Sequence, residues 1–172
     1  MRQTLYLPCF LFSACYNHVR NRTIMKKREY SKYINYTTNQ IAQTYHQFDT
    51  YLGISDSVSD ILYVLEQEGG NCEQRILYKN TMTSRKTISS ALQKMHKEGY
   101  LTITPKNGRE NFVSLTEKGQ ELLKNTGAKI TMAENRVYAE WSEEELKLFY
   151  ELSQRFLKGL NEELRKMKEE KK

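Results

Sequence analysis

Apolar residues recur every three or four positions in several stretches of this 172-residue chain, which is the spacing of one face of an α-helix. The spacing predicts helices over residues 29–52, about 58–68 and 72–80. Gly53 and the glycine pair at 69–70 are expected to end the first two helices, because glycine is a poor helix former. The first half of the chain is therefore predicted to be helical.

The C-terminal part of the chain follows the same periodicity. Thr116 is expected to cap one long helix that runs to about Tyr138. Ser142 and Glu145 have the spacing of a capping box and are expected to begin a last helix. The apolar stripe of that last helix keeps steps of three and four over about six turns: Leu146, Phe149, Leu152, Phe156, Leu160, Leu164 and Met167.

Residues 84–99 combine a helical apolar stripe with many basic and hydroxyl side chains. Ser84 is the expected N-cap, and Gly99 is expected to end the helix in a left-handed conformation. Residues 100–104 alternate like a strand, residues 112–115 offer the return strand, and turn-forming residues lie between them. The pattern therefore predicts a helix followed by a β-hairpin.

The polar face of this helix carries groups that donate to phosphates or to base edges. They are Arg85, Lys86, Thr87, Ser89, Ser90, Gln93, Lys94 and Lys97. A helix that enters the DNA major groove, followed by a hairpin that reaches the minor groove, is the arrangement of a winged helix-turn-helix. The predicted DNA contacts are Arg85, Lys86, Thr87, Ser89, Ser90, Gln93 and Lys94 on the helix, with Lys106 and Arg109 on the hairpin.

Positive charge is concentrated on the same part of the chain. Residues 73–126 hold ten basic and five acidic side chains, a balance of +5, whereas residues 25–72 hold four basic and six acidic ones, a balance of −2. Residues 127–172 hold ten of each. Lysine-rich helix faces are often only solvated, but the charge coincides here with the helix and hairpin pattern and favours binding to phosphates.

Two stretches resemble the MarR family of bacterial transcriptional regulators. Residues 87–101 read T-I-S-S-A-L-Q-K-M-H-K-E-G-Y-L, and residues 113–119, beyond the hairpin, read V-S-L-T-E-K-G. The chain departs from the family at Asn107, where the family commonly has an aspartate two residues before the wing-tip arginine, here Arg109. The resemblance implies a mostly α-helical fold with a small β wing, and a regulator, expected to be a repressor, that binds double-stranded DNA. The family also includes members that respond to small molecules, so an effector is an open possibility.

The resemblance also implies a division of the chain. Residues 55–116 are expected to form the winged helix-turn-helix, while residues 25–54 and 117–172 are expected to form a helical dimerisation region. The apolar stripe of the last helix exceeds what one such module can bury, although part of it could fold back onto the same chain. A homodimer would place its two copies of the 84–99 helix, the recognition helix, about 34 Å apart on an inverted-repeat operator. Residues 1–24 are expected to be a disordered leader.

The sequence gives little support for other classes of function. Its serine, cysteine and histidine residues lie in no catalytic motif, so no catalytic residue and no enzyme activity is expected. The cysteines, Cys9, Cys15 and Cys72, form neither a disulfide framework nor a metal motif, which favours a reducing, cytoplasmic location without metal or cofactor. No apolar run reaches membrane-spanning length. A winged helix that binds proteins and not DNA is the alternative hypothesis.

An effector pocket is the least constrained part of the hypothesis. Four tyrosines on the first two predicted helices are candidates for an aromatic ligand pocket, although aromatic residues at helical spacing also serve as core: Tyr36, Tyr45, Tyr51 and Tyr63. Cys72 is expected to begin the third helix. Because a lone cysteine is more often an inert apolar residue than a sensor, peroxide sensing is not expected there.

Overall fold

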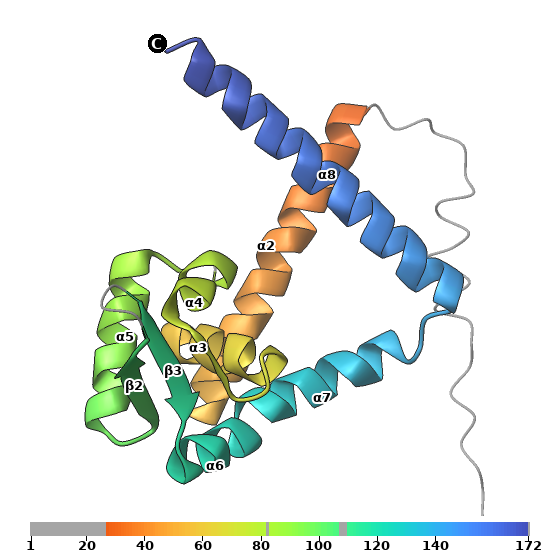
Figure 1. Cartoon of the computed structure of the whole chain (residues 1–172). Helices are drawn as coiled ribbons and strands as arrows, with labels where there is room; N and C mark the ends of the chain where they lie inside the picture. Colours follow the sequence, from red (N-terminus) through yellow and green to blue (C-terminus); the bar gives the residue numbers. More distant parts are fainter. Residues whose placement is uncertain (1–26, 82, 107–109, 172) are drawn as a thin grey trace, which may run out of the picture. The chain divides into compact units, whose positions relative to one another are not determined.

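The structure is a computed structural model that describes residues 27–81, 83–106 and 110–171 (Figure 1). The expected leader, residues 1–24, and the wing-tip Arg109 lie outside the described residues. The elements are helices α2 (Lys27–Leu52) and α3 (Asp56–Gln67), strand β1 (Asn71–Glu73), helices α4 (Gln74–Asn80) and α5 (Arg85–Lys97), strands β2 (Leu101–Pro105) and β3 (Asn111–Leu115), and helices α6 (Glu117–Asn125), α7 (Gly127–Tyr138) and α8 (Glu143–Glu169). The prediction of a mostly helical chain with a small β wing is confirmed.

The three strands form one antiparallel sheet in the order β1-β3-β2. Val113 of β3 pairs with Cys72 on one side and with Ile103 on the other. Strand β1 was not predicted, and the prediction that the third helix begins at residue 72 was wrong, because α4 starts at Gln74 and Cys72 is a buried strand residue. A strand of three residues is too short to show alternation, and its partner lies some forty residues further along the chain.

The long helix that was predicted from Thr116 to about Tyr138 is two helices. Thr126 has φ −128° and ψ −84°, outside the helical region, and separates α6 from α7. Its hydroxyl donates to the carbonyl of Leu122 at 2.6 Å, which satisfies that terminal carbonyl of α6. Gly127 relieves crowding at the start of α7, because an added Cβ would lie 3.0 Å from the Cδ1 of Leu123.

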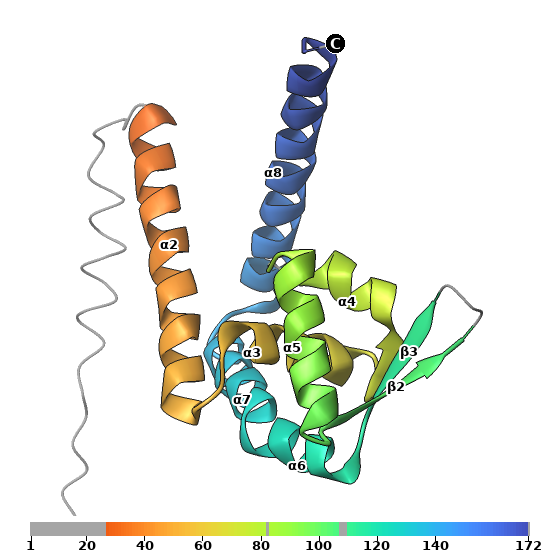
Figure 2. The same cartoon turned by 90° about the vertical axis from the view of Figure 1, so that its left-hand side faces the viewer.

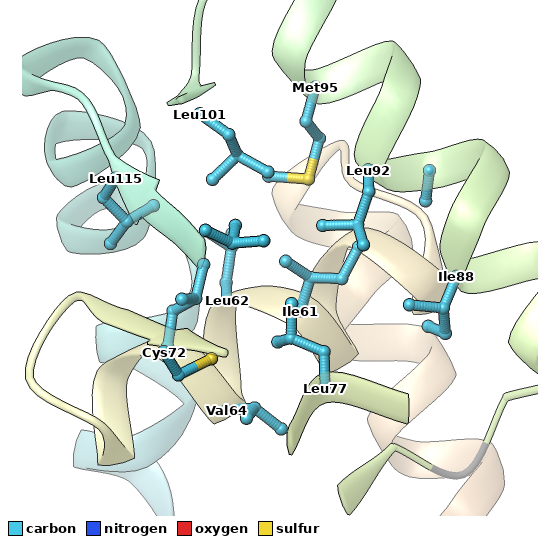
Figure 3. Packing of buried hydrophobic residues seen from close by; sticks show 13 residues of the cluster. Ile61, Leu62, Val64, Cys72, Leu77, Ile88, Leu92, Met95, Leu101 and Leu115 are labelled. Atoms are coloured by element: carbon cyan, nitrogen blue, oxygen red, sulfur yellow. The ribbon is translucent and has the colours of Figure 1, made fainter. Parts of the chain in front are cut away.

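The hydrophobic core lies between α3, α4, α5 and the sheet (Figure 3). Figure 3 shows side chains from these elements converging on Leu62 and Ile61 of α3. The largest fully buried side chains are Ile61, Leu62, Leu65, Leu77, Ile88, Leu92, Met95, Leu101 and Val113. The stripe that was predicted for the 84–99 helix is part of this core, so its burial fixes which face of α5 points outward.

The L-T-E-K-G stretch at residues 115–119 closes the hairpin at its base. The Thr116 hydroxyl donates to the carbonyl of Gly99 at 2.7 Å and accepts from the backbone N–H of Gly119 at 3.1 Å, so it caps α6 as predicted. A Cβ on Gly119 would lie 2.1 Å from the carbonyl oxygen of Tyr100. Only glycine therefore allows the first turn of α6 to pack against the chain that enters β2.

Helix α8 is amphipathic, but none of its residues is buried. Ser142 and Glu145 form the predicted capping box at its start. Its exposed apolar side chains include Leu148, Phe149, Leu152, Phe156, Leu157, Leu160, Leu164 and Met167. This row of side chains, here called the α8 apolar face, needs a covering surface, since large contiguous apolar patches are uncommon on monomers.

Helix α2 is also apolar at exposed positions. It spans the boundary, after Tyr45, between the two compact units into which the chain divides. Tyr33, Ile34 and Ile41, which lie before that boundary, are each at least half exposed. The α2 helix thus adds a second apolar surface without a partner in the described chain.

Candidate nucleic-acid interface

Helix α5 turns a polar face away from the core. Its buried residues, Ile88, Ala91, Leu92 and Met95, follow one stripe. The side chain of Ser84 accepts a hydrogen bond from the N–H of Thr87 at 3.2 Å, which confirms the predicted N-cap. Figure 2 shows α5 with the β2–β3 hairpin extending from its C-terminal end. The helix and the hairpin are the two parts that the winged helix-turn-helix prediction required.

Four exposed residues lie on α5 opposite the buried stripe: Lys86, Ser90, Gln93 and Lys97. The Ser90 hydroxyl donates to the backbone carbonyl of Lys86 at 3.1 Å, while Lys94, beside this face, is 4.0 Å from Glu98. Lys86 and Lys97, about three helical turns apart, can contact phosphates, and Ser90 and Gln93 can bond to base edges. These residues form the outward face of α5.

The other three predicted contacts, in the N-terminal half of α5, lie to the sides of this face and make contacts within the protein. The Thr87 hydroxyl is 2.8 Å from that of Ser84, within the N-cap. Arg85 and Ser89 both contact Tyr78 of α4. The structure thus separates the predicted residues into a group opposite the buried stripe and a group that contacts neighbouring side chains, in which Arg85 and Thr87 are still exposed.

The turn between α4 and α5 is attached to α3 by a hydrogen bond. The Thr83 hydroxyl donates to the carboxylate of Asp60 at 2.6 Å. This bond fixes the chain two residues before α5 begins, and it therefore constrains where the N-terminal end of α5 lies. This contact was not predicted, because the two residues are 23 positions apart and neither belongs to a motif.

An ion-pair cluster lies beside the far end of the β2–β3 hairpin, where Lys106 follows β2 and Glu110 precedes β3. The Glu73 carboxylate binds both Lys106 of the hairpin and Arg75 of α4, and Arg75 also lies 3.9 Å from Glu110. Hydrogen bonds from Lys106 and Arg75 hold the pKa of Glu73 below its ordinary value, and Glu73 in turn raises the pKa of Arg75. Lys106, a predicted DNA contact, is therefore paired with a carboxylate in this structure.

The four candidate pocket tyrosines are exposed to different degrees. Tyr36 and Tyr45 lie on α2 with 63% and 38% of their surface exposed, and Gln40 donates to the Tyr36 hydroxyl at 3.2 Å. Tyr51, near the end of α2, is 87% exposed, and Tyr63 on α3 is 49% exposed. None of the four is part of the core, and their role in a ligand pocket stays a prediction.

Cys72 is a free, buried cysteine in β1. Burial, and to a lesser extent the nearby charges of Glu68 and Glu73, raises the pKa of its thiol to about 11. The thiolate is the reactive form of cysteine, so this side chain is held in its unreactive form at neutral pH.

We expect Cys72 to be nearly inert to thiol reagents in the folded protein. A pKa of about 11 in place of 9.0 lowers the thiolate fraction roughly 100-fold, and burial slows access further. The measurement is the rate of reaction with an aromatic disulfide reagent at pH 8, on a chain in which Cys9 and Cys15 are serine, folded and in urea. If the thiol reacts equally fast in the folded protein and in urea, Cys72 is accessible and reactive in the fold.

Neither a metal site nor a membrane span is evident in the part of the chain that the structure describes. Within those residues, three or more histidine, cysteine, aspartate or glutamate side chains never gather closely enough to hold a metal ion. In the same residues, no helix combines the length and apolar character that crossing a bilayer requires.

Comparison with solved structures identifies the fold. A MarR-family transcriptional regulator from Silicibacter pomeroyi is 20% identical with a TM-score of 0.61, over 73% of this chain and 88% of its own. A MarR transcriptional regulator from Methanosarcina mazei is 21% identical with a TM-score of 0.58, over 85% and 98%. The PcaV regulator from Streptomyces coelicolor, solved with its natural ligand, is 19% identical with a TM-score of 0.56, over 72% and 91%.

No protein-family model and no curated protein sequence matches the chain. At these identities the structural likeness defines the fold: the chain is a winged helix-turn-helix protein with the fold of MarR-type transcriptional regulators. The resemblance that was inferred from residues 87–101 and 113–119 is confirmed at that level.

Proposed function

We propose that this protein is a homodimeric, sequence-specific DNA-binding regulator of the MarR type, acting as a repressor. The observation that carries the proposal is the outward face of α5, where Lys86, Ser90, Gln93 and Lys97 are exposed beside a β hairpin. In a winged helix-turn-helix the corresponding helix enters the major groove. A repressor of this kind acts by occupying an operator.

The dimer is supported by surfaces that the single chain leaves uncovered. The α8 apolar face runs along a 27-residue helix without one buried residue, and α2 carries exposed apolar residues as well. Two chains that pair through these helices would bury both surfaces. Such a dimer has two-fold symmetry, so its two α5 helices would read an inverted repeat.

A small-molecule effector is the less constrained part of the proposal. The Streptomyces coelicolor regulator of similar fold was solved with a natural ligand. On this chain the candidate contacts for an aromatic effector are the exposed rings of Tyr36 and Tyr45 in one compact unit, or those of Tyr51 and Tyr63 in the other. Occupancy of a site next to the dimerisation helices would change the spacing of the α5 helices and hence the affinity for DNA.

The alternative is a winged helix that binds another protein and not DNA. The ion pairs of Lys106 and Arg75 with Glu73 favour it, since they neutralise two cations beside the wing. The exposed lysines on α5 favour DNA. Binding to an arbitrary DNA duplex as a function of salt separates the two, because phosphate contacts release counterions.

We expect the logarithm of the affinity for an arbitrary duplex to fall linearly with the logarithm of the salt concentration. Replacing Lys86 and Lys97 by alanine should reduce the slope by about 2, one for each lost phosphate contact. The matched control replaces Lys147 and Lys158, which are equally basic and exposed but belong to α8. Fluorescence anisotropy measures the slopes; an undiminished slope in the α5 variant, or no salt-dependent binding at all, contradicts the proposal.

A further inference from the structure

Tyr78 of α4 contacts two residues on one flank of α5. The Cζ atom of Arg85 lies 4.6 Å from the centroid of the Tyr78 ring, within cation–π range. The Tyr78 hydroxyl is 2.9 Å from the hydroxyl of Ser89, one helical turn beyond Arg85. A single half-buried tyrosine, which packs against the core, thus contacts two residues that were predicted to bind DNA.

Two amide side chains fix the orientation of the tyrosine. The Nδ2 of Asn111, at the start of β3, donates to the Oε1 of Gln74 at 2.9 Å, and the Nε2 of Gln74 donates to the Tyr78 hydroxyl at 2.6 Å. Because the phenolic oxygen accepts this bond, its own proton is available to Ser89. Hydrogen bonds therefore link the wing strand, α4 and α5, and they hold the ring against which Arg85 stacks.

We propose that Tyr78 is a positioning residue for base readout by Arg85, an inference that rests on the proposed DNA-binding function. An exposed arginine side chain samples many rotamers and loses this freedom when it binds. Stacking on Tyr78 restricts the guanidinium before DNA arrives, so less entropy is lost on binding. The partner that suits a fixed guanidinium near the start of α5 is the guanine edge, whose O6 and N7 accept two parallel hydrogen bonds.

The test compares the full-length protein with Tyr78→Phe and Tyr78→Leu. The probes are the duplex that the wild-type protein enriches from a randomised pool and a scrambled duplex of the same composition. The measured quantity is the affinity for the enriched duplex divided by the affinity for the scrambled one. Phenylalanine keeps the ring but removes its hydrogen bonds, so this ratio should fall about 3-fold. Leucine removes the ring, so the ratio should fall about 10-fold. The matched control is Tyr100→Phe, because Lys118, and no residue of α5, stacks on that ring.

The decisive measurement repeats both changes in an Arg85→Ala protein. If Tyr78 acts through Arg85, neither change lowers the ratio further in that background. If the affinity ratio falls by the same factor with and without Arg85, Tyr78 does not act through Arg85. If binding to both duplexes weakens equally, Tyr78 does not affect base readout. Either result overturns the role proposed for Tyr78 and leaves the proposed DNA-binding function standing. A wild-type protein that enriches no sequence contradicts the proposed function itself.

Discussion

Replacing Phe156 and Leu160 by lysine should convert the dimer into a monomer and lower the affinity for the enriched duplex by roughly 100-fold or more. Both side chains lie on the α8 apolar face and are more than half exposed in the single chain. Two charges in the centre of a buried interface would be desolvated without a partner. Each monomer would then bind one half-site independently, and the additional affinity that comes from linking two DNA-binding units would be lost.

The matched control for this variant adds the same two charges to a side of α8 that Phe156 and Leu160 do not share. Gln154 and Asn161 are exposed polar residues, so their replacement by lysine should leave the dimer intact. Light scattering at several protein concentrations gives the mass, and circular dichroism checks that helices are retained. If the apolar-face variant stays dimeric with unchanged affinity, the α8 apolar face is not the dimer interface.

Replacing Gly119 by alanine should destabilise the fold by about 3 kcal/mol. The new Cβ would lie 2.1 Å from the carbonyl oxygen of Tyr100, a backbone atom that can move only if β2 or α6 shifts. Such a shift would also disturb the bonds of Thr116 with Gly99 and Gly119. Urea unfolding, followed by circular dichroism, measures the change in the free energy of unfolding.

Gly159 provides the control for this substitution. It also lies within a helix, but an added Cβ there meets nothing within 4 Å. Alanine at position 159 should therefore leave the stability unchanged or raise it by up to about 1 kcal/mol, the difference in helix propensity. If the two alanine variants change the free energy of unfolding equally, the close approach at Gly119 is not a constraint on the fold.

Much of the fold could be predicted because its signals are local. The stripe of α5, the caps at Ser84, Thr116 and Ser142, and the hairpin pattern each lie within a few residues of sequence. The family resemblance then supplied the topology that joins them. Contacts between distant residues were missed, including strand β1 and the bond between Thr83 and Asp60.

The candidate site was less predictable than the fold. The sequence places basic and hydroxyl residues on α5, but it does not separate the exposed Lys86 from Arg85, which stacks on Tyr78. Nor does it indicate that Glu73 binds Lys106, because that pair forms only when β1 joins the sheet. The spacing of Gln74 and Tyr78, one helical turn apart, is the single local signal that could have suggested their bond.

Selection from a randomised duplex pool, followed by determination of the mass of the protein–DNA complex, tests the central claim most directly. We predict enrichment of an inverted repeat whose half-site centres lie about one turn of DNA apart, bound by two chains. Enrichment of no sequence, or of a single half-site that is bound by one chain, would contradict the account.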